Sequence, residues 1–152
     1  TKAAHDMSAD VLIIEMGSNG GWDDYDELIS QYKAMIANSA TQCYIIIGDT
    51  DNPDEAIDSG NYNSSKEVGL NDTLWEAALR EAFGEHFINM RTYLMQNALD
   101  ITGKEANETD IENLLDGRVP DSIKYDYTHL NGYGYYAYGA GVYEKGVELG
   151  YW

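Results

Sequence analysis

The chain has 152 residues, of which 43% are hydrophobic and 12% aromatic, and such values exclude an intrinsically disordered chain. A formal net charge of −18 repels phosphate backbones and anionic lipid, so we expect neither a nucleic acid nor a membrane as partner. The composition and length predict one α/β domain over residues 1–152. The only cysteine, Cys43, allows no disulfide within the chain. It leaves a bacterial cytoplasmic and a secreted or cell-surface location both open.

The first predicted elements alternate between buried strands and an amphipathic helix. Residues 10–16 form an apolar run closed by Gly17, which predicts a strand covered on both faces. Apolar side chains then recur at helical spacing from Tyr25 to Ile36, which predicts a helix. Residues 42–47 predict a second buried strand, and the polar stretch 50–69 predicts a long loop.

The second half of the chain continues this alternation. We predict a helix over 72–83 capped by Gly84, a short strand over 86–90, a helix over 93–99, and a capping box at 109–112 that opens a helix ending at Gly117. A last, glycine-rich helix spans 131–149, and its expected buried stripe is Tyr136, Ala140, Tyr143 and Val147. This order predicts a parallel sheet with helices on both faces and ligands at the carboxyl ends of the strands.

Two short segments carry residues suited to catalysis. Asp126 precedes His129 by three residues in a loop before the last helix, so its carboxylate can fix the imidazole tautomer and stabilise the protonated ring. Asn19 follows the first strand and offers a neutral amide donor to an oxyanion. Gly17 permits the sharp turn that brings Asn19 toward the site.

The two segments resemble motif blocks of the SGNH (GDSL-type) hydrolases, a family of serine esterases and lipases. Gly17-Ser18-Asn19-Gly20 resembles one block, and Asp126-Tyr127-Thr128-His129 before the final helix resembles another. The resemblance implies a flavodoxin-like, three-layer α/β/α SGNH fold that needs no metal or organic cofactor. It implies His129 as general base, Asp126 as its orienting partner, Asn19 and Gly17 at the oxyanion, and small-molecule or carbohydrate acyl esters as substrates.

The chain departs from the family pattern in two ways. Gly20 stands where the family usually has Asp, and the blocks with the nucleophilic serine and a second oxyanion glycine are absent. We therefore expect the C-terminal portion of an SGNH domain, without its first strand-helix-strand unit and inactive alone. Ser18 and Ser122 are poor substitutes, because Met16 disrupts a nucleophile elbow at Ser18 and Ser122 lies on a loop. An open edge at residues 11–16 then predicts a homodimer or a partner chain carrying the upstream segment.

Other aromatic and charged residues receive more ordinary roles, and two alternative functions stay open. Trp22 is predicted to face the substrate because it follows the Asn19 loop, Trp75 to lie in the core, and Arg91 to form an ion pair. The first alternative is a flavodoxin-like binding or electron-transfer module, although Asp23 and Asp24 would repel a cofactor phosphate. The second is a catalytically retired interaction domain that keeps the fold.

Overall fold

The computed structural model describes residues 10–50 and 65–152. Three strands form one parallel sheet in the order β1-β2-β3. The predicted loop 50–69 lies mostly outside the described residues, and its last part includes a short helix. The elements in chain order are β1 (Leu12–Ile14), α2 (Tyr25–Ser39), β2 (Tyr44–Ile47), α3 (Ser65–Val68), α4 (Leu74–Phe83), β3 (Phe87–Ile88), α5 (Met90–Thr102), α6 (Glu108–Leu115) and α7 (Gly132–Glu148).

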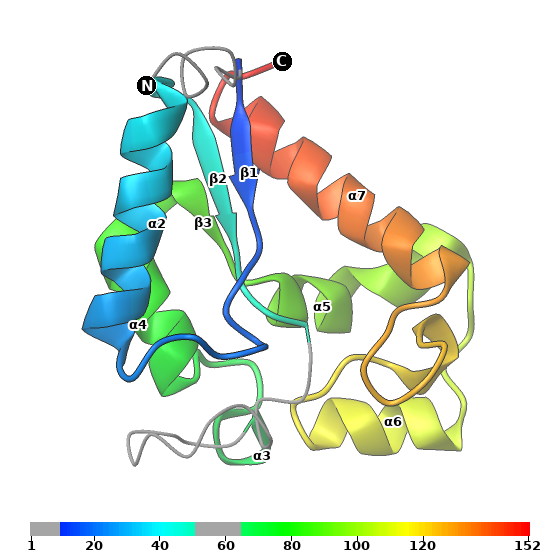
Figure 1. Cartoon of the computed structure of the whole chain (residues 1–152). Coiled ribbons are helices and arrows are strands. Elements are labelled where there is room, and N and C mark those ends of the chain that lie inside the picture. Colours follow the sequence, from blue (N-terminus) through cyan, green and yellow to red (C-terminus); the bar gives the residue numbers. More distant parts are fainter. Residues whose placement is uncertain (1–9, 51–64) are drawn as a thin grey trace.

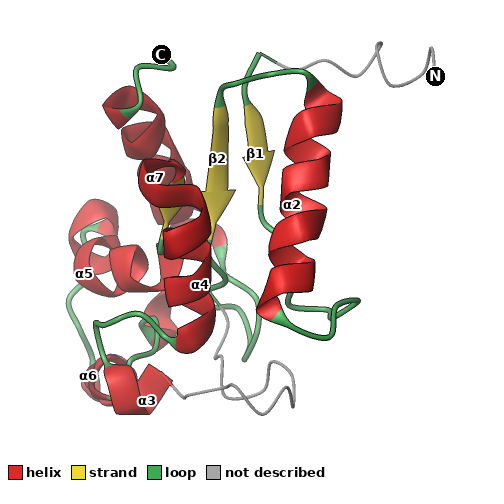
Figure 2. Ribbon diagram, turned by 90° about the vertical axis from the view of Figure 1, so that its left-hand side faces the viewer, coloured by secondary structure: helices red, strands yellow, loops and turns green. Residues whose placement is uncertain are grey.

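Helices cover both faces of the sheet, as the sequence predicts. Ile45 and Ile47 of β2 point into a core formed with α5 and α7. Ile46 points the other way, into a core with α2 and α4 that includes Trp75. Figure 1 shows α2 and α4 on one side of the strands and α5 and α7 on the other, and the turned view in Figure 2 shows β1 and β2 between α2 and α7. The central strand is buried on both faces because each face carries its own core.

Side-chain caps fix where the helices begin. The Asp24 carboxylate accepts a hydrogen bond from Glu27 N at 2.8 Å at the start of α2. The capping box expected at 109–112 lies two residues earlier. There the Asn107 side chain accepts from Asp110 N at 2.9 Å, and the Asp110 carboxylate accepts from Asn107 N at 3.0 Å. An Asx cap with a reciprocal acid satisfies the same donors as a Thr cap.

The buried face of α7 differs from the predicted stripe. Tyr136 is 66% exposed and Tyr143 61% exposed, and the residues of α7 that are buried are Gly134, Ala137, Gly141 and Gly146. A Cβ added to Gly141 would lie 2.7 Å from the Tyr93 ring of α5. The helix therefore turns its small residues inward, because only these allow such close packing. The stripe prediction was wrong because it assigned burial by side-chain size.

The prediction that both faces of β1 are covered is also wrong. Ile14 is 4% exposed in the core with α2 and α4, whereas Ile13 is 47% exposed. On the second face α7 contacts β2 and β3, and it leaves Ile13 partly open to solvent.

A buried ion pair links the helical half of the structure. Arg91 at the start of α5 donates from Nε and Nη2 to the two carboxylate oxygens of Glu76, both at 2.7 Å, which confirms the predicted ion pair. Three further hydrogen bonds reach the backbone oxygens of Gly69 and Gly117 at 2.7 Å and of Asn71 at 2.9 Å. One side chain thus connects α4, α5 and the turns that follow α3 and α6.

Candidate functional site

The loop before α7 is held at both ends by polar side chains. Asp110, fully buried in α6, accepts a hydrogen bond from Ser122 N at 2.7 Å. The Asn131 amide donates to the backbone oxygens of Ser122 and Lys124, each at 3.0 Å. The Asn131 side-chain oxygen also caps α7 by accepting from Tyr133 N at 2.9 Å. The loop and the first turn of α7 therefore form one rigid unit.

Within this unit the chain folds back on itself around Asp126. Lys124 and Leu130 form an antiparallel bridge. Tyr125 N donates to His129 O at 2.8 Å, and Asn131 N donates to Ile123 O at 2.9 Å. These backbone bonds confine the intervening residues to a tight turn, which brings the Asp126 and His129 side chains together.

Asp126 and His129 form the pair that the sequence predicts. His129 Nδ1 lies 2.9 Å from both carboxylate oxygens of Asp126. The pKa of Asp126 is lowered from its ordinary value. The main cause is the hydrogen bond that its carboxylate accepts from the His129 backbone N–H at 2.7 Å, and the second is the hydrogen bond with the His129 imidazole. An ionised carboxylate only accepts hydrogen bonds, so Nδ1 carries the proton and neutral His129 keeps its lone pair on Nε2. This is the tautomer that a general base requires.

His129 lies on the wall of a cavity of about 150 Å³. The cavity opens at the carboxyl ends of β1 and β2, where parallel sheets commonly bind ligands. Its wall combines residues from three separate segments, which are Glu15, Ser18, Asp49, Thr50, Thr128, His129, Leu130, Tyr135 and Tyr138. His129 therefore shares this cavity with the hydroxyl of Ser18 and the carboxylates of Glu15 and Asp49, which follow the strands.

The carboxylates of this cavity influence one another. Burial raises the pKa of Glu15. A hydrogen bond from Tyr138 lowers it by a smaller amount, and the nearby Asp49 carboxylate raises it further. Burial first, and then the charge of Glu15, raises the pKa of the Tyr138 hydroxyl above its ordinary value. Tyr138 therefore stays protonated and donates to Glu15. The side chains of Glu15 and Asp49 thus give the cavity an acidic part of its wall.

The turn after β1 places its two polar residues differently. Gly17 has φ +117°, a conformation that suits glycine, and Gly20 N donates to Gly17 O at 2.9 Å. Between them, Ser18 lines the cavity, whereas Asn19 is an exposed residue of the turn and is not part of the cavity wall. The oxyanion roles of Asn19 and Gly17 stay predictions.

Trp22 occupies the core and not the cavity wall. Its side chain is 7% exposed, its ring centroid lies 5.5 Å from that of Trp75, and its Nε1 donates to Gly17 O at 3.0 Å. The structure thus places Trp22 as an anchor of the turn after β1, in contrast to the predicted substrate-facing position. The ring is drawn inward because Trp75, itself predicted correctly as core, gives it an aromatic partner.

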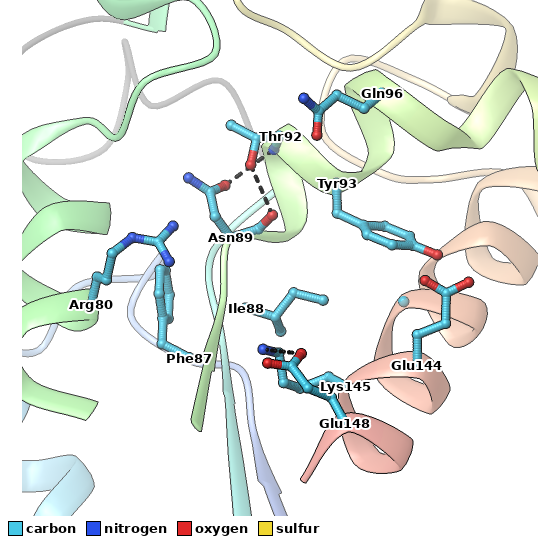
Figure 3. A pocket seen from close by; sticks show the side chains of 11 residues that line it. Arg80, Phe87, Ile88, Asn89, Thr92, Tyr93, Gln96, Glu144, Lys145 and Glu148 are labelled. Carbon is cyan, nitrogen blue, oxygen red and sulfur yellow. Dashed lines mark hydrogen bonds and ion pairs between the residues drawn. The ribbon is translucent and has the colours of Figure 1, made fainter. Parts of the chain in front are cut away.

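A second cavity, of about 300 Å³, lies beside β3 between α4, α5 and α7. Figure 3 shows the Tyr93 hydroxyl directed at Glu144 and an ion pair between Lys145 and Glu148, whose Nζ–Oε2 distance is 2.6 Å. Burial and the Glu144 carboxylate raise the pKa of Tyr93 to about 12. Because Glu148 already engages the Lys145 amine, this cavity offers weaker grounds for chemistry than the one at His129.

Sequence reasoning missed Glu15 and Asp49 as cavity residues. The signal for the two acids was present, since Glu15 and Asp49 each stand one or two residues beyond a strand and parallel strand ends meet at one edge. Within residues 10–50 and 65–152, no cluster of three or more His, Cys, Asp or Glu side chains has the geometry of a metal site.

Comparisons with protein-family models, with curated proteins and with solved structures gave no match. In the described part of the chain, none of the helices combines the length and apolarity needed to cross a bilayer.

Proposed function

We propose that this chain provides the acid–base half of an SGNH-type serine acyl hydrolase acting on small acyl esters, including those of carbohydrates. The observation that carries the proposal is the bidentate contact of Asp126 with His129 Nδ1, 2.9 Å to each oxygen, at a cavity on the strand ends. The resemblance of the two motif blocks to the family supports the same conclusion.

In the proposed reaction a serine Oγ attacks the ester carbonyl while His129 Nε2 accepts the hydroxyl proton. Asp126 stabilises the resulting imidazolium through Nδ1. The C–O bond of the tetrahedral intermediate then breaks, and His129 returns its proton to the departing alcohol. Water repeats the sequence on the acyl-serine, which releases the acid and restores the serine. The side-chain amide of Asn19 and backbone N–H groups of the turn that starts at Gly17 are the proposed oxyanion donors.

The nucleophile is the component to be identified by experiment. Ser18 shares the cavity with His129, and the alternative is a serine from a further segment that approaches the same cavity. A fluorophosphonate reacts covalently with an activated serine, so peptide mapping of the adduct would name the nucleophile directly.

The proposal is tested by hydrolysis of p-nitrophenyl acetate with the protein expressed from its native reading frame. Loss of a general base typically lowers the rate by about 10²–10⁴, so His129→Ala should reduce kcat/KM in this range. Asp126→Asn should reduce it as well, because an Asn carbonyl can stabilise the ring tautomer but not the imidazolium charge.

His86→Gln is the matched control. His86 Nδ1 lies 3.1 Å from Tyr44 O and its ring stacks on Tyr44, and His86 does not line the cavity of His129. Its substitution should leave kcat/KM within about twofold. If His129→Ala and His86→Gln hydrolyse the ester equally fast, the assignment of His129 as base is refuted.

The flavodoxin-like alternative gains no support from the site. The cavity at the strand ends carries the carboxylates of Glu15 and Asp49, which repel the phosphate of a flavin nucleotide. A helix N-terminus with free backbone donors would be needed there, but Asp24 caps the helix that follows β1.

A further inference from the structure

The edge of β1 is open to another strand. In the described part of the chain β1 pairs with β2 alone, and Leu12 N donates to Cys43 O at 2.9 Å. Backbone groups alternate in direction along a strand, so the N–H and C=O of Ile13 point away from β2. Proline and charged side chains usually protect an edge strand from pairing, and residues 11–14 contain neither.

The side chain of Ile13 is available together with its backbone. It is 47% exposed, because α7 packs mainly on β2 and β3. In Figure 1 β1 is the strand at the margin of the sheet, between the helical layers. Met16, just beyond the strand, is 55% exposed. The edge therefore offers unpaired hydrogen-bonding groups and apolar surface at the same place.

We propose that β1 of a second copy of this chain pairs antiparallel with this edge, centred on Ile13. A two-fold axis at Ile13 makes the interface self-complementary, since each Ile13 exchanges both backbone hydrogen bonds with its counterpart. In this register Val11 faces Glu15 of the second copy, and Asp10 faces Met16. No two acidic side chains stand directly opposite each other, and the two Ile13 side chains meet on one face.

Size and charge make this a weak dimer with a characteristic salt dependence. Pairing over residues 10–16 forms a strip about 23 Å long at about 3.3 Å per residue. A strip that is only one strand wide buries less than the roughly 800 Å² per partner of a standard interface. Each copy carries a net charge of −18, and the resulting repulsion is screened by salt. The association constant of a dimer held by uncharged strands should therefore rise by roughly tenfold between low and high salt. An interface made of ion pairs would instead weaken as salt is added.

Sedimentation equilibrium of the full chain at about 10–500 µM, in 0.05 and 0.5 M NaCl, tests the proposal. We expect the mass to rise from that of one chain toward that of two, with a smaller dissociation constant at high salt. Ile13→Pro should abolish the rise. Proline removes only the outward N–H at this position and is accepted on an edge strand.

Ile13→Thr is the control, because it keeps the N–H donor and a β-branched side chain. It should dimerise with at most a several-fold weaker constant. Leu115→Thr removes a more exposed apolar side chain from α6 and should change nothing. Far-UV circular dichroism shows that each variant is folded, and Ile13→Lys repeats the test should the proline variant unfold.

A single-chain mass throughout the concentration range at high salt would overturn the proposal. The partner of the β1 edge would then be a strand of a different polypeptide. A dimer that survives both Ile13→Pro and Ile13→Lys would place the interface elsewhere and overturn it equally. Neither result depends on ester hydrolysis, so the dimer and the proposed function stand or fall separately.

Discussion

Removing Arg91 should destabilise the fold more than removing any exposed charge. The side chain is 1% exposed and its five N–H donors are engaged by Glu76 and by the backbone oxygens of Gly69, Asn71 and Gly117. Arg91→Met keeps much of the volume but leaves a nearly buried carboxylate without its partner. Breaking a buried pair in this way costs about 3–5 kcal/mol. The orphaned carbonyls add to this cost where water cannot reach them.

We therefore expect Arg91→Met to lower the free energy of unfolding by at least about 4 kcal/mol, and Tm by about 8–16 °C for a chain of this size. Urea unfolding followed by tryptophan fluorescence measures the first quantity. Adding Glu76→Gln to Arg91→Met should recover only part of the loss. It removes the unpaired charge, but the carbonyls of Gly69, Asn71 and Gly117 still lack their donor.

Arg118→Ala is the matched control for this experiment. Arg118 pairs with Asp116 at 3.1 Å, and the two side chains are 29% and 30% exposed. A partly exposed pair contributes about 0–1 kcal/mol. If Arg91→Met costs no more than Arg118→Ala, the reasoning that five satisfied donors stabilise the junction of α4 and α5 is refuted.

Three further predictions concern α7 and the carboxylates. Gly134→Ala should lower the free energy of unfolding by about 2 kcal/mol, because the added Cβ would lie 2.3 Å from Ile123 O. Gly139 has open space around it, so Gly139→Ala should raise the free energy of unfolding by about 0.5–1 kcal/mol. Thermal unfolding of both variants tests this difference. Burial alone would raise the pKa of Asp110, but backbone hydrogen bonds lower it. Its contribution is present above pH about 4 and is lost as pH falls through the depressed value, so the stability of Asp110→Asn should vary less with pH in that window than wild type. Because the pKa of Glu15 is raised in the folded state, its ionisation opposes folding, and Glu15→Gln should be more stable than wild type at pH 7 but not at pH 4, as measured by urea unfolding at both pH values.

Sequence reasoning succeeded where structure is determined by neighbours in the chain. The Asp126–His129 pair was predictable because three residues separate the two side chains and both belong to one loop. The starts of α2 and α4 were predictable to within about two residues, because caps are local hydrogen bonds between a side chain and the next turn. The alternation of strands and helices was predictable from periodicity.

It failed where burial depends on distant segments. The exposure of Ile13 follows from the path of α7 over β2 and β3, which no local pattern reports. The rotation of α7 was misjudged because its large side chains lie outside, while Gly134 and Gly141 meet the loop and α5. Arg91 was expected to form an ion pair, but its partner Glu76 lies 15 residues away, and their contact exists only after α4 and α5 pack.

The Asp126–His129 pair and the cavity beside it depend on different parts of the chain. The pair of Asp126 and His129 is closed by backbone hydrogen bonds within its own loop, so its geometry is determined mainly by residues close together in the chain. The cavity is different, because Ser18, Glu15 and His129 reach it from β1 and from the loop before α7, more than 100 residues apart in the chain. Local stability cannot account for such a convergence of a hydroxyl, a carboxylate and an imidazole. A variant that fills the cavity without touching the pair or a candidate nucleophile, such as Thr50→Leu, therefore discriminates. It should abolish ester hydrolysis while leaving the imidazole signals of His129 in NMR spectra close to those of wild type. Undiminished hydrolysis would show that the cavity is not where the ester reacts.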